Sequence, residues 1–231
     1  GPGKHADSPT RRVAEYADSL GIPLIAEPSS GLCDLASWLP HGPLVAGRLL
    51  QELQDGADSV GQVVVLGRAT LSREVDELLA ALGTGDTRKI VVSRSEQWQD
   101  PSGTATVVVP GLLPDERDET SGALQVERRI WQQHCRQVAA DVEAVVREHS
   151  VGLGHLGAAR MIWRHSEDWN LWLSASNVIR AFDIGASAPG ERDVYSNRGL
   201  SGIDGTIASA LGLAAVSVKP VRAVLGDLSF C

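Results

Sequence analysis

The residues best suited to chemistry form a glycine-rich stretch from Tyr195 to Gly205, YSNRGLSGIDG. Three glycines in its last seven residues let the backbone approach a ligand closely, because glycine has no Cβ. Arg198 offers a planar guanidinium group that matches a carboxylate. Ile203 is an unusual apolar residue in this setting unless its side chain packs against something. The composition favours a binding site over a plain connection between a strand and a helix.

Two further segments also place polar residues directly after an apolar strand. Val221–Leu225 is followed by a glycine and Asp227, a carboxylate of the type that binds magnesium together with phosphates. Leu171–Ala175 runs into Ser176 and a helix carrying Arg180, and these two residues share a helix face. Alone, this segment fits a helix-capping serine with an exposed arginine equally well. Because parallel strands end at one edge of a sheet, the segments together predict a single crevice.

Three other patterns do not predict sites. Gly152–Gly157 matches the string GxGxxG, but it follows a helix and not a strand, so we interpret it as a junction between a loop and a helix. His134 and Cys135 are adjacent on a helix and point in different directions, so they cannot hold one metal ion. A GxSxG motif of serine hydrolases is absent from the sequence.

The elements that must position these residues alternate between β-branched runs and helical patterns, which is typical of a parallel α/β fold. The expected strands are Ile22–Ala26, Gln62–Leu66, Lys89–Ser93, Thr104–Val109, Leu171–Ala175, Val194–Ser196 and Val221–Leu225. The expected helices are Thr10–Leu20, Ser72–Leu82, Thr206–Val216 and a long helix, Leu124–His149, with apolar residues at Ile130, Val138, Val142, Val145 and Val146. The sequence therefore predicts two Rossmann-like units with parallel sheets, joined by a long helix.

The expected boundaries follow from these elements. Residues 1–118 are expected to form the first unit, which ends in the charged stretch Asp115–Glu119. Residues 119–151 are expected to contain the linker and the connecting helix. Residues 152–231 are expected to form the second unit. The formal net charge of −8 argues against a general role in nucleic-acid binding. Three widely spaced cysteines without a CxxC pair favour a reducing, cytoplasmic setting. We expect no stable insertion into a membrane, and the lack of an initiator methionine suggests a piece of a longer protein.

The strand ends and the glycine-rich turn resemble the cofactor half of thiamine-diphosphate enzymes. More narrowly, the chain is similar to the family of 2-succinyl-5-enolpyruvyl-6-hydroxy-3-cyclohexene-1-carboxylate synthases of menaquinone biosynthesis. The resemblance implies a central domain that lacks its first strand, followed by the amino-terminal half of the diphosphate-binding domain. It further implies that the catalytic site forms between subunits of a homodimer or homotetramer.

The resemblance also assigns roles to individual residues. Ile203 matches the residue that holds thiamine in its bent conformation, and Asp227 matches the ligand of magnesium, with manganese as an alternative metal. The group that holds substrate carboxylates is implied to be Ser176, Arg180 and Arg198, with Arg73 as a further member from the first unit. The implied cofactor contacts are Ser176, Gly202, Ile203, Gly226, Asp227, Leu228 and Ser229.

The implied reaction condenses isochorismate with 2-oxoglutarate, with loss of carbon dioxide. Both substrates are dicarboxylates, which fits Arg180 and Arg198. In the family's motif a second magnesium ligand, an asparagine, follows about two dozen residues after the aspartate, beyond Cys231, and the catalytic glutamate lies on another domain. We therefore expect this chain alone to be inactive. Two alternatives stay open: an acetolactate-synthase-like carboligase or decarboxylase, and a Rossmann-like binding module without catalysis.

Overall fold

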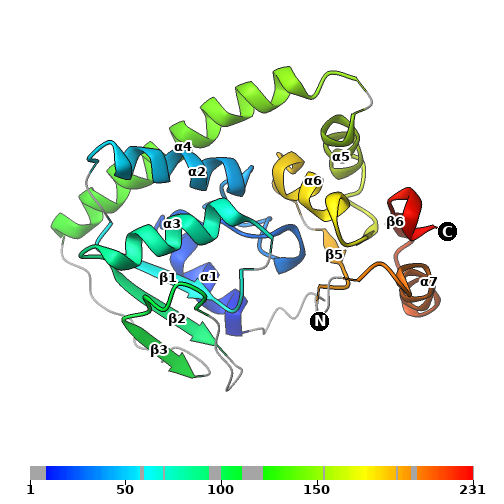
Figure 1. Ribbon diagram of the computed structural model, residues 1–231, viewed down its shortest axis with the longest axis horizontal. Coiled ribbons are helices and arrows are strands. Elements are labelled where there is room, and N and C mark those ends of the chain that lie inside the picture. The colour runs from blue at the N-terminus through cyan, green and yellow to red at the C-terminus, as the bar shows by residue number, and fades with distance from the viewer. Residues whose placement is uncertain are drawn as a thin grey trace.

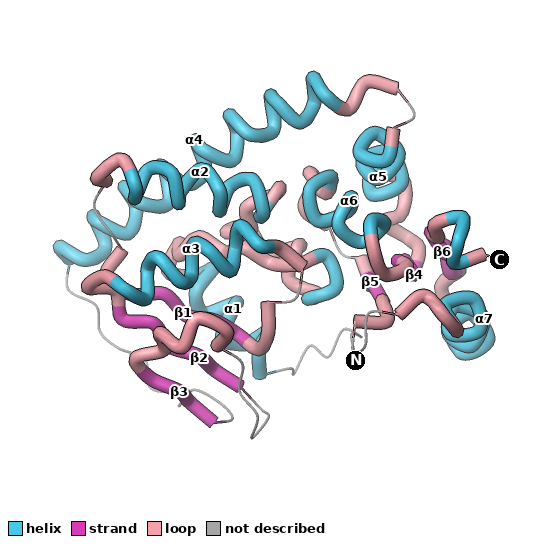
Figure 2. The backbone as a smooth tube through the Cα atoms, in the orientation of Figure 1, coloured by secondary structure: helices cyan, strands magenta, loops and turns pink. Residues whose placement is uncertain are grey.

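The computed structural model describes residues 9–57, 60–69, 71–93, 100–110, 122–152, 154–190, 192–198 and 202–230. Over these residues the chain is an α/β protein with two parallel three-stranded sheets and seven α-helices (Figures 1 and 2). The predicted fold class is confirmed. None of the helices in the described ranges combines the length and the apolar character that a membrane span requires.

The first sheet contains β1 (Gln62–Leu66), β2 (Arg88–Ser93) and β3 (Val107–Pro110), in that spatial order. The central strand β2 is the most deeply buried, as expected for a strand with a neighbour on both sides. Helix α3 (Arg73–Thr84) starts at Ser72, whose hydroxyl accepts the Val75 N–H at 3.2 Å. This cap satisfies one of the unpaired N–H groups in the first helical turn.

The second sheet has the order β5-β4-β6, so β4 (Asn170–Leu173) lies between β5 (Asp193–Tyr195) and β6 (Val221–Val224). Every residue of β4 is buried. Helices α5 (His155–Arg164) and α6 (Asn177–Gly185) pack against each other beside this sheet, and α7 (Thr206–Val216) precedes β6. Because all three strands are parallel, the segments that follow them begin at the same edge.

The long connecting helix is present as α4 (Gly122–His149), 28 residues that span about 42 Å. It runs across the top of the molecule in Figure 1 and contacts α2 (Gly42–Gln54). Val138 and Val146 are buried as predicted, and Val142 packs against the core. The assignment of Ile130 and Val145 to the apolar stripe is wrong, since their side chains are 64% and 55% exposed.

One predicted strand is not formed. Ile22–Ala26 contains a single bridge residue, Leu24, which exchanges backbone hydrogen bonds with the irregular segment around Trp38. Pro23 lacks the N–H that a continued ladder would use, and the chain turns into a short 3₁₀ helix at Pro28–Ser30. The first sheet therefore has three strands in the described residues, where four were expected.

The remaining differences concern boundaries and one helix. The strand expected at Thr104–Val109 starts at Val107, and in the segment before it the Thr104 hydroxyl accepts a hydrogen bond from the Lys89 ammonium group. Helices α1 (Pro9–Ser19), α3, α4 and α7 lie within two residues of their predicted bounds. Helix α2 was not predicted, although its sequence has a proline in the first turn, a common start signal.

The segment between α1 and α2 packs with the second sheet and not only with the first. Cys33 and Trp38 share a buried cluster with Trp163 and Phe182. Leu71, which directly precedes α3, belongs to the same cluster. The segment between α1 and α2 and the residue before α3 thus contribute to the apolar core of the second sheet. The predicted boundaries at residues 118 and 151 stay predictions, and the charged linker at 115–119 lies outside the described residues.

Candidate functional site

Most of the predicted site residues gather at the carboxyl edge of the second sheet. Ser176 and Arg180 follow β4, Arg198 follows β5, and Asp227 follows β6. Since β4 pairs with both other strands, the three segments begin side by side. The other predicted residues belong to the same connections: Gly202 and Ile203 lie between β5 and α7, and Gly226, Leu228 and Ser229 lie after β6.

A hydrogen bond between two serines ties the ends of β4 and β6 together. The Ser174 and Ser229 hydroxyl oxygens lie 3.0 Å apart, and the Ser174 N–H donates to the Val224 carbonyl at the same distance. Ser174 is buried. Between these contacts the chain turns at Asp227, an exposed residue whose Oδ1 accepts the Leu228 N–H at 2.9 Å. The carboxylate is therefore held in a defined orientation at the strand end.

Ser176 has a strained backbone. Its dihedral angles are φ 69° and ψ −132°, a combination that is rare for any residue except glycine. Its side chain is exposed and makes no capping hydrogen bond to α6. The interpretation of Ser176 as a simple helix cap is therefore wrong. Backbone strain of this kind concentrates at ligand-binding positions, which supports a functional role for this residue.

Two glycines of the edge face open space. A Cβ added to Gly202 or to Gly226 would meet no atom of the described residues within 4 Å. These positions leave room for a group that approaches the backbone. Ile203 is half-buried beside them, and its carbonyl accepts the Thr206 hydroxyl at 2.7 Å at the start of α7. Gly199, Leu200 and Ser201 of the same stretch lie outside the described residues.

A buried acid that the sequence reasoning missed lies behind this edge. Asp183 on α6 is 8% exposed, and burial raises its pKa to about 8, with a further increase from Glu27 and Glu74. The nearby guanidinium group of Arg198 acts in the opposite direction. No pattern in the sequence marked Asp183, because its pKa is set by burial and by charged residues on other elements.

Arg73 lies on α3, the helix between β1 and β2 of the first sheet. It is exposed at the first position of α3. Its neighbour Glu74 influences Asp183 electrostatically, so the start of α3 lies toward the second sheet. The Leu71 N–H, which donates to Glu27 at 3.0 Å, fixes the segment before α3 in this place. Any contact of Arg73 with a substrate stays a prediction.

A polar cavity elsewhere is too small to compete as a site. It measures about 30 Å³ and lies against β1, β2 and α3, lined in part by Arg68, Asp76 and Lys89. This volume suits about one water molecule. The Lys89 ammonium group donates to Asp100 at 2.7 Å and to two hydroxyl groups at 2.8 and 3.0 Å. These bonds satisfy all its donors and stabilise the loop before β3.

The donor set at the edge suits a hard cation shared with a phosphate-bearing ligand. In the described residues no group of three or more His, Cys, Asp or Glu side chains is arranged around a metal site. Magnesium is often held by one or two carboxylates plus ligand phosphates, and Asp227 is the carboxylate among the predicted site residues that could contribute in this way. The Ser196 hydroxyl, which is buried without a hydrogen-bond partner in the described part of the chain, also lies just after β5.

Two sheets of parallel strands that alternate with helices define a Rossmann-like α/β protein. The chain is 38% identical over 221 residues to a 2-succinyl-5-enolpyruvyl-6-hydroxy-3-cyclohexene-1-carboxylate synthase from Kineococcus radiotolerans, and the match covers 94% of this chain. Synthases of the same name from Renibacterium salmoninarum and Leifsonia xyli subsp. xyli are 32% and 34% identical, each over 93% of this chain.

The chain is therefore a homologue of these synthases over almost its whole length, and the predicted resemblance is confirmed. It spans 38%, 36% and 42% of the lengths of these three relatives. No protein-family model matches the chain.

Proposed function

We propose that the protein containing this chain is a 2-succinyl-5-enolpyruvyl-6-hydroxy-3-cyclohexene-1-carboxylate synthase that acts in menaquinone biosynthesis. In this proposal it condenses isochorismate with 2-oxoglutarate, using thiamine diphosphate and magnesium. The names of the relatives support the reaction. The observation that carries the proposal for this chain is the carboxyl edge of the second sheet. The segments that follow its three strands carry the oriented carboxylate of Asp227, the open backbone at two glycines and the strained backbone of Ser176.

The residues present fit a magnesium-bound diphosphate. Asp227 would bind the metal, and the open space at Gly202 and Gly226 would admit the cofactor close to the backbone. Leu228 and Ser229 would border it, since they follow Asp227 in the same turn. Ile203 would offer the cofactor an apolar side chain to pack against. The bound cofactor would act as the electron sink of the reaction.

The substrate carboxylates would be held by guanidinium groups. Arg180 is exposed on α6, and Arg198 is half-buried at the end of β5. Planar guanidinium groups form paired hydrogen bonds with carboxylates, which fixes the orientation of a dicarboxylate better than a lysine would. Ser176 would add a hydroxyl group at the start of the same helix. An acetolactate-synthase-like enzyme with monocarboxylate substrates would need fewer such groups.

The metal assignment is tested by Asp227→Asn in the full-length protein. We expect this change to remove magnesium-dependent binding of thiamine diphosphate, because an amide loses the charge that holds the cation. The matched control is Asp168→Asn, since Asp168 is equally exposed but precedes β4 at the opposite end of the strand. Calorimetry with and without magnesium measures both variants. Unchanged binding in Asp227→Asn would refute the assignment.

The substrate assignment is tested by Arg198→Ala. We expect the rate with dicarboxylate substrates to fall by about a hundredfold or more, while cofactor affinity stays within about twofold, because a charge-assisted bond is lost only to the substrate. Arg164→Ala serves as the control, since Arg164 is exposed at the end of α5. Steady-state kinetics and calorimetry separate the two effects. Unaltered kinetics would exclude this role for Arg198.

A further inference from the structure

A buried carboxyl group lies on the face of α6 that carries the proposed substrate residues. Asp183 is 8% exposed and follows Arg180 by three positions, so the two side chains lie on adjacent turns of one helix face. Ser176, four positions before Arg180, begins the same face. In the described part of the chain no hydrogen bond reaches the Asp183 carboxyl group. This group therefore has hydrogen-bonding capacity left, although more than nine-tenths of the residue is buried.

The groups around Asp183 come from several segments of the chain. Glu27 precedes the 3₁₀ helix that packs against α6 and β5, and Glu74 lies in the first turn of α3. Both carboxylates disfavour a negative charge on Asp183, whereas the guanidinium group of Arg198 favours one. Burial, together with Asp183, raises the pKa of the Cys33 thiol to about 12, so Cys33 adds no charge. Asp183 thus lies near two carboxylates and one guanidinium group.

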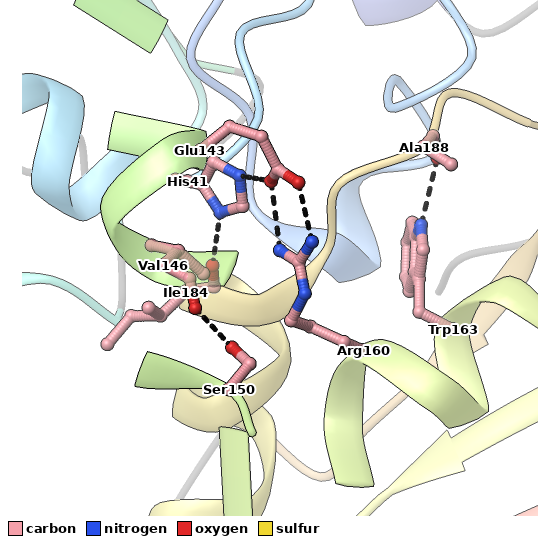
Figure 3. A network of polar contacts seen from close by, with 8 residues as sticks. All are labelled: His41, Glu143, Val146, Ser150, Arg160, Trp163, Ile184 and Ala188. Carbon is pink, nitrogen blue, oxygen red and sulfur yellow. Dashed lines mark hydrogen bonds and ion pairs between the residues drawn. The ribbon is translucent and has the colours of Figure 1, made fainter. Parts of the chain in front are cut away.

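The polar side chains of the other helices against α6 pair with each other. Helices α2 and α5 both pack against α6. His41, directly before α2, contacts the Ile184 carbonyl oxygen and Glu143 of α4, and Arg160 of α5 forms two hydrogen bonds with the same glutamate (Figure 3). The charge state of Asp183 is therefore set by its burial and by the groups of the preceding paragraph.

Burial has the largest effect on Asp183, and it raises the pKa of this carboxyl group to about 8. At neutral pH most molecules carry a proton there, which provides one O–H donor besides the acceptor oxygen. An ionised aspartate in this place would repel a ligand carboxylate that Arg198 attracts. A protonated one donates to that carboxylate, and a hydrogen bond to an ionised acceptor is stronger than one between neutral groups.

We propose that Asp183 is a specificity-determining residue that donates a hydrogen bond to the ligand carboxylate bound by Arg198. This inference rests on the function proposed above, because that function makes the ligand a dicarboxylate. Arg198 supplies the attractive charge, and the O–H group of Asp183 adds one directed bond that selects a carboxylate in a defined orientation. Glu27 and Glu74 contribute by keeping the proton on Asp183.

The first test is the pH dependence of dicarboxylate binding to the unaltered full-length protein. The probe is succinate, which does not react and stays doubly ionised from pH 7 to pH 9, and calorimetry measures its dissociation constant. We expect the constant to rise about tenfold over this range, because Asp183 loses its proton. Asp183→Asn should bind succinate within about twofold of the unaltered protein at pH 7, without the rise, since an amide donates but does not ionise. A constant affinity from pH 7 to pH 9 in the unaltered protein would overturn the inference.

The second test removes the donor. Asp183→Leu should bind succinate about tenfold more weakly at pH 7, the factor for one lost hydrogen bond to a charged group. The matched control is Asp76→Leu, because burial also raises the pKa of Asp76, which lies on α3 beside the small cavity of the first sheet. This control should bind like the unaltered protein. Equal succinate affinity in both variants and the unaltered protein would overturn the inference.

The outcomes separate this inference from the proposed reaction. Succinate affinity that depends on Asp183, in a protein that does not consume isochorismate, would support the inference and refute the reaction. Isochorismate consumption with a succinate affinity independent of both Asp183 and pH would do the reverse. A full-length protein that binds no succinate would overturn the inference, because no carboxylate would then be held beside Arg198.

Discussion

At the scale of single residues, Asp183 shows how burial sets a charge state. The carboxyl group is 8% exposed, and Glu27 and Glu74 add to the cost of ionising it, so its pKa rises to about 8. At neutral pH the folded protein therefore keeps this acid protonated. The protonated Asp183 is therefore a neutral hydrogen-bonding group near Arg198, and it does not compete as an anion with a substrate carboxylate for that guanidinium group.

This state predicts a pH dependence of stability. Between about pH 4 and pH 8 the unfolded chain is ionised at Asp183 while the folded chain is protonated, so the free energy of unfolding falls as pH rises. The slope from this residue is at most about 1.4 kcal/mol per pH unit. Asp183→Asn should remove that part of the slope, as measured by urea denaturation from pH 5 to pH 8. A slope equal to that of the unaltered protein would contradict the prediction.

Site residues that directly follow a strand could be predicted from the sequence. Contacts between residues that are far apart in the sequence could not. Ser176, Arg198 and Asp227 were predictable as neighbours because the ends of parallel strands lie together. His41 and Glu143 are 102 positions apart, and no local pattern links them. The backbone strain at Ser176 also depends on the turn that the packed strand and helix impose.

At the scale of elements, two helical glycines differ in their surroundings. Gly157 lies buried in α5, where a Cβ would collide with the backbone carbonyl oxygens of Gly152 and Ser150. Gly212 lies exposed in α7, where a Cβ would meet no atom within 4 Å in the part of the chain that the structure describes. The first glycine permits the close turn from α4 into α5, whereas the second only weakens its helix.

Alanine substitutions should therefore have opposite effects on stability. Gly157→Ala is expected to lower the free energy of unfolding by about 1–3 kcal/mol through overpacking. Gly212→Ala is expected to raise it by about 1 kcal/mol, because alanine favours helix formation. Denaturant unfolding of both variants measures the difference. Equal and small effects would mean that the turn at Gly152 accommodates a side chain.

Helices with a clear apolar period and strands of β-branched residues were predictable, whereas irregular segments were not. Val63–Leu66 reads as a strand from its composition alone. Ile22–Ala26 has a similar apolar content, but Pro23 and its irregular partner leave one bridge at Leu24. The exposure of Ile130 and Val145 depends on which side of α4 the core contacts, and that is set by tertiary packing.

At the scale of the whole molecule, the proposed function implies that this chain supplies only part of the catalytic site. It spans 38% of its Kineococcus radiotolerans relative, and the family resemblance assigns a second metal ligand and a catalytic glutamate to other segments. We expect the isolated 231 residues to bind thiamine diphosphate with a dissociation constant weaker than about 100 μM and to lack activity. Isothermal titration calorimetry measures this directly. Low-micromolar affinity for this chain alone would contradict it.

The central claim is tested most directly by isochorismate consumption in the full-length protein. The assay contains isochorismate, 2-oxoglutarate, thiamine diphosphate and magnesium, and each component is left out in turn. The account predicts that isochorismate disappears only when all four are present. Isochorismate that persists in the complete mixture, or that disappears without 2-oxoglutarate or without the cofactor, would contradict the proposed synthase.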